Sequence, residues 1–368
     1  MTAGGRNRLH DLLVERCDRE PCEMSEPLVW FLACRGRLCL ARTPVRPTEP
    51  AAELGLPIRG LWADRPYPES LLASEFVTVS RRYLTMTLKR ELEDAGSPIR
   101  RFFSEHLPDT RAMTSSYREV LVGSITILPD PRAGTPPWSP IGHAISALLQ
   151  WQLCPTPTAS IAGLACDRIA RHTNSEDVLR RYKEVVLAGP SDLDLDEASR
   201  VAWIAGLLDR AYRSGISDDP LLAPIENASD WDDLLAQLPA AWTADVAAMA
   251  AACQPIIEVH RSPAVVIDPV FAGSHSVGGA DGDYIADGGL LVDIKATKEP
   301  KLATRDLRQL ISYALLDWDD QYAIRSVGIL AVRQSRLVTW TLEAAISMMA
   351  SRDVTAPQMR TTFRSSLE

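Results

Sequence analysis

The sequence predicts a chain of mixed α and β structure, in which a strand-rich C-terminal part follows a long helical part. In the last third of the 368 residues, apolar runs and one tight hairpin are typical of strands. A segment with helical spacing interrupts these strands. The predicted strands are 264–270, 284–286, 290–295, 325–332 and 337–342, and the helix between them is 304–317.

Proline-rich breaks divide the chain into regions. Residues 44–70 and 129–140 are rich in proline and lack periodic spacing, which is typical of loops. We therefore expect an N-terminal α/β region of unassigned role at 1–135, a helical region at 136–255 and a mixed α/β region at 256–368.

The N-terminal region contains patterns of both kinds. Residues 28–41 are interpreted as a hairpin of two buried strands. A helix is expected to end at Gly96, and another to begin at Pro98, because proline suits a first helical turn. Residues 121–128 are interpreted as a strand.

The helical region is predicted from apolar and Ala-rich spacing. The segment 194–214 has acids in its first turn and arginines near its end, in agreement with the helix dipole. The other helices are expected at 142–153, 159–172, 175–187 and, as one or two helices, 230–253.

Composition is typical of a soluble globular protein, with 46% hydrophobic and 24% charged residues. No apolar run suggests a membrane span, and the N-terminus lacks the apolar core of a signal peptide. We therefore expect a cytoplasmic protein with no membrane partner.

The seven cysteines show no strong metal-site spacing. Cys17-x₄-Cys22 and Cys34-x₄-Cys39 leave zinc binding with His10 as an alternative, although zinc pairs usually lie closer together. An odd number of cysteines in a cytoplasmic protein is typical of reduced, packed thiols.

The stretch 278–297 carries most of the chemistry. Its turn residues 287–289 tolerate the positive φ that a tight hairpin requires. Side chains alternate along the second strand, so Asp293 and Lys295 share one face. The hairpin then returns Asp283 beside Asp293, and we expect two carboxylates and an ammonium group to converge at the strand edge.

This combination of charges suits a hydrolytic metal site. Neighbouring carboxylates repel each other unless a cation lies between them. Mg²⁺ is usually held by one or two carboxylates together with waters and phosphates, and a lysine nearby can orient an attacking water. The ordinary alternative for a lone Asp-x-Lys is a hairpin whose charges face water.

The surrounding residues favour the metal-site interpretation. Asp283, Asp293 and Lys295 resemble the Asp and the (D/E)-x-K of the PD-(D/E)xK nuclease superfamily. The following helix carries Gln309 and Tyr313 one turn apart, which is similar to the Q-x-x-x-Y motif of the RecB-type exonuclease-like branch. The resemblance covers about 264–342. It implies an αβββαβ core with a mixed sheet.

The resemblance also implies roles for these residues. Asp283, Asp293 and the Ile294 carbonyl would bind one or two Mg²⁺ or Mn²⁺ ions, and Lys295 would position the attacking water. Gln309 and Tyr313 would face the active site and the DNA backbone. No cysteine follows Cys253, so the iron–sulfur cluster of some RecB-type nucleases is expected to be absent.

Two positions leave the ligand set open. Asp281 is either a further ligand or a residue that positions Gly282. Some RecB-type nucleases have a Gly-x-x-x-His helix start with a metal-binding His. Gly142 matches the Gly, but Ser146 holds the His position, and His143 is either a ligand in another register or an ordinary helix-start residue.

A net charge of −9 argues against a general nucleic-acid coat protein, whose affinity comes from neutralised phosphates. A local basic strip suffices for a nuclease, and Arg305 and Arg308 are candidates for phosphate contact. We expect weak unaided DNA binding, or a partner protein that delivers the substrate or activates the nuclease on it.

The sequence therefore predicts a Mg²⁺- or Mn²⁺-dependent deoxyribonuclease acting in defence against foreign DNA or in DNA repair. The alternative is a catalytically silent nuclease-fold protein that acts as a DNA- or protein-binding subunit of a larger assembly. No RNA-binding motif supports an RNase. No Gly-x₄-Gly-Lys-[Ser/Thr] motif is present, so any motor would be a separate chain.

Overall fold

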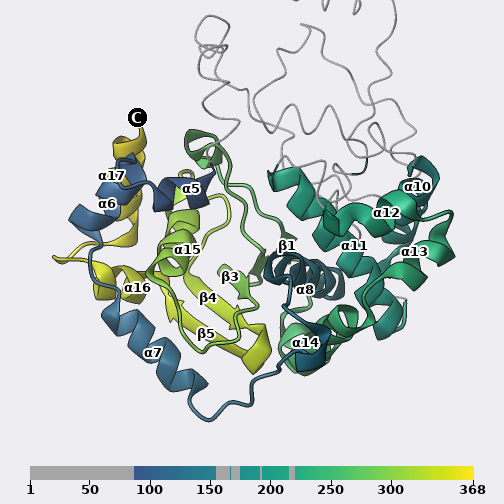
Figure 1. Cartoon of the computed structure of the whole chain (residues 1–368). Coiled ribbons are helices and arrows are strands. Elements are labelled where there is room, and N and C mark those ends of the chain that lie inside the picture. The colour runs from purple at the N-terminus through teal and green to yellow at the C-terminus, as the bar shows by residue number, and fades with distance from the viewer. Residues whose placement is uncertain (1–86, 155–165, 167–174, 191–192, 215–219) are drawn as a thin grey trace, which may run out of the picture. The chain divides into compact units, whose positions relative to one another are not determined.

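A five-stranded mixed sheet organises the described part of the protein (Figure 1). The structure, a computed structural model, describes residues 87–154, 166, 175–190, 193–214 and 220–368. The strands are β1 (Val266–Ile267), β2 (Tyr284–Ala286), β3 (Leu290–Lys295), β4 (Ser326–Ala331) and β5 (Arg336–Thr341). They follow one another across the sheet in chain order, and only the β3–β4 pair is parallel.

The connections explain that one parallel pair. The two-strand hairpin joins β2 to β3, whereas α15 (Thr304–Leu316) carries the chain from β3 back to the start of β4. A parallel pair needs such a crossover. The mixed α and β prediction is confirmed, although β1 is shorter than the predicted 264–270 strand; beyond it, Val270 and Asp281 form an isolated bridge.

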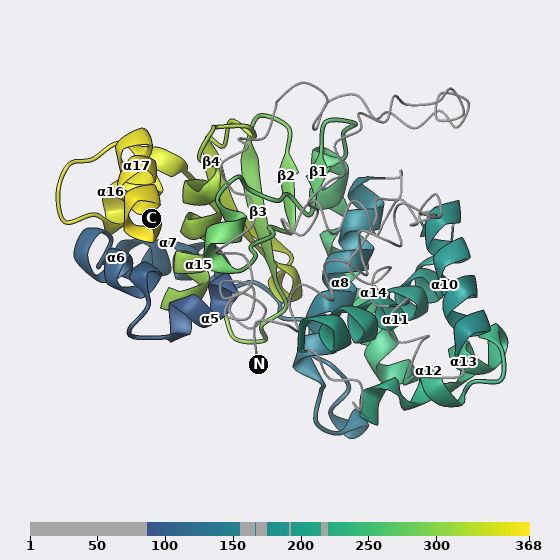
Figure 2. The same ribbon diagram turned by 90° about the horizontal axis from the view of Figure 1, so that it is seen from above.

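Helices pack against both faces of the sheet (Figure 2). One hydrophobic core joins a sheet face to α8 (Trp138–Leu153), α10 (Glu176–Ala188), α11 (Leu195–Ser214), α12 (Ala223–Asn227), α13 (Trp231–Gln237) and α14 (Ala240–His260). The other core joins the opposite face to α5 (Leu88–Glu93), α6 (Pro98–His106), α7 (Arg111–Leu121), α15, α16 (Leu342–Met349) and α17 (Ala356–Leu367). The described residues also form short 3₁₀ turns, among them η6 (Val332–Gln334).

The predicted alternation along β3 is confirmed by these two cores. Val292 and Ile294 pack in the core of α8 and α14, whereas Leu291 packs in the core of α15. Asp293 and Lys295 therefore lie on the α15 face of the strand.

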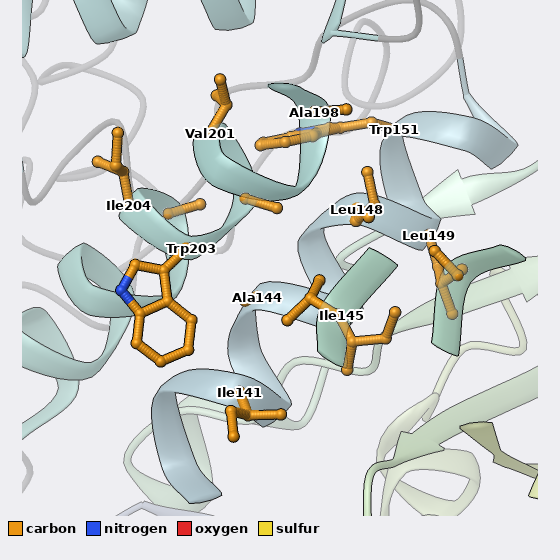
Figure 3. Close-up of a cluster of buried hydrophobic side chains, with 14 of the residues drawn as sticks. Ile141, Ala144, Ile145, Leu148, Leu149, Trp151, Ala198, Val201, Trp203 and Ile204 are labelled. Atoms are coloured by element: carbon orange, nitrogen blue, oxygen red, sulfur yellow. The ribbon is translucent and has the colours of Figure 1, made fainter. Parts of the chain in front are cut away.

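Close packing of α8 against α11 fixes the helix that reaches the hairpin (Figure 3). Ile141 and Ile145 of α8 are fully buried, as are Val201 and Ile204 of α11. A Cβ on Gly206 would lie 2.5 Å from the carbonyl oxygen of Pro140, so glycine is needed for this approach. The predicted helix at 142–153 is present and begins earlier, at Trp138.

The other predicted helices of this region are also present where the structure describes them. Ser175 is the N-cap of α10, and α11 ends at Ser214 as predicted. The 230–253 segment forms two helices, α13 and α14. The predicted hairpin at 28–41, the loop at 44–70 and the cysteine pairs before residue 40 lie outside the described residues. So does the predicted helix at 159–172, apart from Cys166, which is helical and buried.

The strand predicted at 121–128 is wrong. α7 continues to Leu121, and the next residues have no regular structure, with Ile125 88% exposed. The segment is held instead by Ile127, whose N–H donates to the carbonyl of Arg333 at 2.7 Å. The apolar run therefore contacts the short 3₁₀ turn η6 and pairs with no strand of the sheet.

Helix boundaries near the start of the described chain agree in part. The helix before Gly96 ends earlier, at Glu93 with Asp94 as C-cap, so Gly96 is not the cap. α6 begins at Pro98 as predicted, because the Ser97 hydroxyl accepts from the N–H of Arg100 at 3.0 Å.

The predicted boundaries at 135 and 255 do not divide the described chain. All of the described residues belong to one compact unit. α5, α6 and α7 share a core with α15, α16 and α17, so segments from both ends of this unit build one layer.

One described helix, α14, is long and apolar enough to span a membrane. This differs from the prediction that no apolar run approaches that length. The helix nevertheless carries the buried Asp245, which is paired with Arg333, and its Val246 and Met249 are fully buried in the core. α14 is therefore a core helix of a folded unit.

Candidate active site

The tight hairpin brings Asp283 against β3. Gly288 and Gly289 have φ of 78° and 77°, which glycine adopts without strain. A Cβ on Gly289 would also lie 2.2 Å from the carbonyl oxygen of Ala323. With this turn, the N–H of Ile294 donates to Oδ2 of Asp283 at 2.6 Å. The carboxylate of one strand is thus fixed by the backbone of the next.

Lys295 lies among acceptors from β3 and α15. Its Nζ is 2.8 Å from Oδ2 of Asp293 and donates to Oε1 of Gln309 at 3.2 Å. Oδ1 of Asp306, in the first turn of α15, is 3.8 Å away. The side chains of Lys295 and Asp293 are 18% and 5% exposed, so this pair is largely withdrawn from water.

The two predicted residues of the α15 motif are linked to this lysine. Nε2 of Gln309 donates to the hydroxyl of Tyr313 at 2.6 Å. The Tyr313 ring is buried and stacks on Phe271 with a centroid distance of 5.7 Å. The structure therefore brings Gln309 to Lys295 directly, and Tyr313 through Gln309.

Two residues of α8, Ser146 and Gln150, complete the surroundings of Asp283. The Ser146 hydroxyl donates to Oδ1 of Asp283 at 2.6 Å. Nε2 of Gln150 donates to the Asp283 carbonyl at 2.9 Å and to Oδ1 of Asp268 at 2.7 Å. Sequence reasoning did not select either residue. The available signal was that Ser146 occupies the His position of the Gly-x-x-x-His pattern, with Gln150 one turn later.

His143 lies in a different contact. Its Nδ1 is 2.6 Å from Oδ2 of Asp209 on α11. The imidazole therefore joins α8 to α11, which favours the reading of His143 as a helix-start residue over that of a ligand.

Burial and mutual repulsion shift the pKa values of the acids at the site. Burial raises the pKa of Asp293 to about 7; Lys295 lowers it, and the charge of Asp283 raises it further. Burial also raises the pKa of Asp283, against the hydrogen bonds from Ile294 and Ser146. Burial lowers the pKa of Lys295, but the charges of Asp293 and then Asp306 raise it more, so the net shift is upward. A buried ammonium thus faces an excess of carboxylate.

The arginines predicted to contact phosphate differ in position. Arg308 is buried, with its guanidinium 5.6 Å from the centroid of the Phe103 ring, and burial lowers its pKa. The structure therefore does not bring Arg308 to the site. Arg305 is 42% exposed and forms an ion pair of 2.5 Å with Glu93. It remains accessible to a ligand at the surface.

Asp281 lies close to the site without a decisive role. It pairs with Val270 through the isolated bridge, and its charge contributes to the raised pKa of Asp283. Its two predicted roles, a ligand or a residue that positions Gly282, are both compatible with this place.

Asp283, Asp293 and the carbonyl of Ile294 are the groups that would hold a divalent cation at this site. Among the described residues, no group of three or more His, Cys, Asp or Glu side chains is placed to hold a metal ion. One or two carboxylates still suit Mg²⁺, which keeps several waters. Burial is the main cause of the raised pKa of Asp293, and a cation bound beside this carboxylate would lower that pKa.

The chain matches no protein-family model, no curated protein and no solved structure. The function of the site is therefore inferred from its own residues.

Proposed function

We propose that the protein is a cytoplasmic, Mg²⁺- or Mn²⁺-dependent deoxyribonuclease that hydrolyses phosphodiester bonds, in defence against foreign DNA or in DNA repair. The observation that carries the proposal is the contact of Lys295 with Asp293 and Gln309 beside the fixed carboxylate of Asp283. The element order α14–β1–β2–β3–α15–β4 also supports it, since it agrees with the αβββαβ core that the sequence resemblance implies.

Each residue has a role that its contacts support. Asp283, Asp293 and the Ile294 carbonyl would hold the cation, which supplies positive charge to the phosphate and to the leaving oxygen. Lys295 would orient the attacking water by donating a hydrogen bond. The side-chain carbonyl oxygen of Gln309 accepts a hydrogen bond from the ammonium of Lys295.

The surrounding residues would prepare this arrangement before DNA binds. Ser146 and the N–H of Ile294 hold the two oxygens of Asp283, and Tyr313 orients the amide of Gln309. Such fixed geometry lowers the reorganisation that the reaction requires. Arg305, at the surface of α15, would contact a backbone phosphate in exchange for Glu93.

Cleavage assays with the full-length chain test this proposal. Linear, circular and single-stranded DNA, and RNA, are incubated with Mg²⁺, Mn²⁺ or a chelator. We expect metal-dependent cleavage of DNA by the wild type and none by Lys295→Met or Asp293→Asn. Lys301→Met and Asp232→Asn, which change exposed residues, are the matched controls and should cleave normally.

The substrate pattern also separates the alternatives. Cleavage of RNA alone would replace the proposed substrate. Binding of DNA without cleavage in either metal would favour the catalytically silent DNA- or protein-binding subunit. If a partner protein delivers DNA or activates the nuclease on it, a cell extract should restore cleavage by the wild type but not by Lys295→Met.

A further inference from the structure

We propose that Asp306 is a positioning residue that takes Lys295 over from Asp293 when a divalent cation binds. This inference rests on the proposed metal-dependent function. It concerns a residue of α15 that lies outside the predicted motifs, and it assigns to that residue control over the competition between lysine and metal.

The starting point is a conflict at Asp293. The same carboxylate is the ion-pair partner of Lys295, at 2.8 Å, and a proposed ligand of the cation. A cation bound to the same carboxylate would lie close to the ammonium of Lys295, and the two positive charges would repel each other. A cation on Asp293 therefore requires the ammonium of Lys295 to move.

Asp306 offers the ammonium a second carboxylate within reach. Its Oδ1 is 3.8 Å from Nζ of Lys295, which is an ion-pair distance but too long for a hydrogen bond. Lysine has a flexible stem and three donors, so a small movement closes this gap. Gln309 lies one turn after Asp306 on α15 and accepts from the same ammonium at 3.2 Å. The amide can remain a partner in both positions.

The neighbours of Asp306 leave it available for this exchange. Nε of Arg305 is also 3.8 Å from Oδ1 of Asp306, but Nη1 of Arg305 lies 2.5 Å from Glu93. Glu93 therefore holds that arginine more closely. The Asp306 side chain is 13% exposed, so its charge is only partly screened by water.

A double-mutant cycle on metal binding tests the inference. Mn²⁺ binding to the full-length chain is measured by calorimetry, without DNA, in wild type, Asp306→Asn, Lys295→Met and the double variant. We expect Asp306→Asn to weaken Mn²⁺ binding about tenfold, because Lys295 then stays on Asp293 and competes. In the Lys295→Met background, Asp306→Asn should have no effect.

The same measurements contain the results that would overturn it. Equal weakening in both backgrounds would make Asp306 a ligand or a general negative charge. Glu299→Gln, which removes an exposed acid from the β3–α15 loop, controls for the latter and should leave binding unchanged. Asp306→Glu should restore binding, because it keeps the second carboxylate.

Failure of the inference and of the proposed function have different signatures. If wild type binds no Mn²⁺, the metal-dependent function fails and the inference fails with it. If wild type binds Mn²⁺ and Asp306→Asn binds it equally well, only the role of Asp306 is wrong.

Discussion

Two buried ion pairs lie near the C-terminal end of β3, and they differ in how the positively charged side chain is held. Arg333 donates to both oxygens of Asp245, at 2.9 and 2.7 Å, and its Nε donates to the carbonyl of Ala296 at 2.8 Å. Nη1 also donates to the carbonyl of Ile127. Fixed backbone acceptors and a bidentate fork therefore determine the place of this guanidinium.

Lys295 is held by movable groups. Its acceptors are the side chains of Asp293, Gln309 and, farther away, Asp306. The Arg333 and Asp245 side chains are 0% and 1% exposed, whereas Lys295 is 18% exposed. Burial of a charge therefore does not by itself mark a functional group. A cation whose partners can be exchanged is available for chemistry, and a saturated one is not.

The largest expected effect tests the exchangeable pair. We expect Lys295→Met to lower the cleavage rate at least about 10³-fold while the free energy of unfolding falls only a little, because Asp293, whose pKa is about 7, can take up a proton when its partner is lost. Without the lysine, the pKa of Asp293 should rise above about 7, so the acid is neutral at physiological pH and tolerates its site. Single-turnover cleavage and urea denaturation measure the two quantities. A loss of stability that matches the loss of rate would contradict the comparison.

The saturated pair should respond in the opposite way. We expect Arg333→Met to lower the free energy of unfolding by about 3–5 kcal/mol, since it leaves the Asp245 carboxylate buried without its partner. Urea denaturation measures this change. Adding Asp245→Leu should recover much of the loss, because it removes the unpaired charge. A small loss of unfolding free energy in Arg333→Met, or no recovery of it in the double variant, would show that the pair is not saturated.

The sequence predicted the local geometry of the site well. The glycines of the 287–289 turn and the alternation along β3 depend only on neighbouring residues, and so does the Gln309–Tyr313 spacing on α15. These patterns are set by backbone sterics and by strand and helix periods. That Gln309 faces the site was implied by the family resemblance of the sequence, and the structure brings its amide to Lys295.

What the sequence could not provide was contact across long separations. Ser146 and Asp283 are far apart in the chain, and only the packing of α8 against α11 and the sheet brings them together. Arg308 has the spacing of an exposed residue, yet α6 covers it with Phe103. The 121–128 segment has strand-like composition but no strand edge beside it. In each case tertiary packing overrides the local pattern.

A third buried acid, Asp317 at the end of α15, should make the stability of the protein depend on pH. Burial raises its pKa to about 6, from an ordinary value of 3.8. The folded state then binds more protons than the unfolded state between these values, so stability falls as pH rises through that window. Asp317→Asn lacks this fall. We expect its stability relative to wild type to increase by up to about 2 kcal/mol between pH 4 and 7. Urea denaturation at four pH values across this range measures the difference, and a constant difference would contradict the raised pKa.

The smallest expected effect concerns Ser146, whose hydroxyl holds one oxygen of Asp283 while the N–H of Ile294 holds the other. Because the backbone contact remains, Ser146→Ala should reduce cleavage only roughly tenfold, which corresponds to about 1.4 kcal/mol and is typical of a hydrogen bond to a charged group. Ser146→Thr keeps the hydroxyl and should retain most activity. Ser199→Ala is the matched control, since Ser199 donates to the Leu195 carbonyl within α11. Equal rates for the two alanine variants would mean that the backbone alone fixes Asp283. In that case α8 would support the site only through its packing, and the backbone N–H of Ile294 would be the group that holds the Asp283 carboxylate.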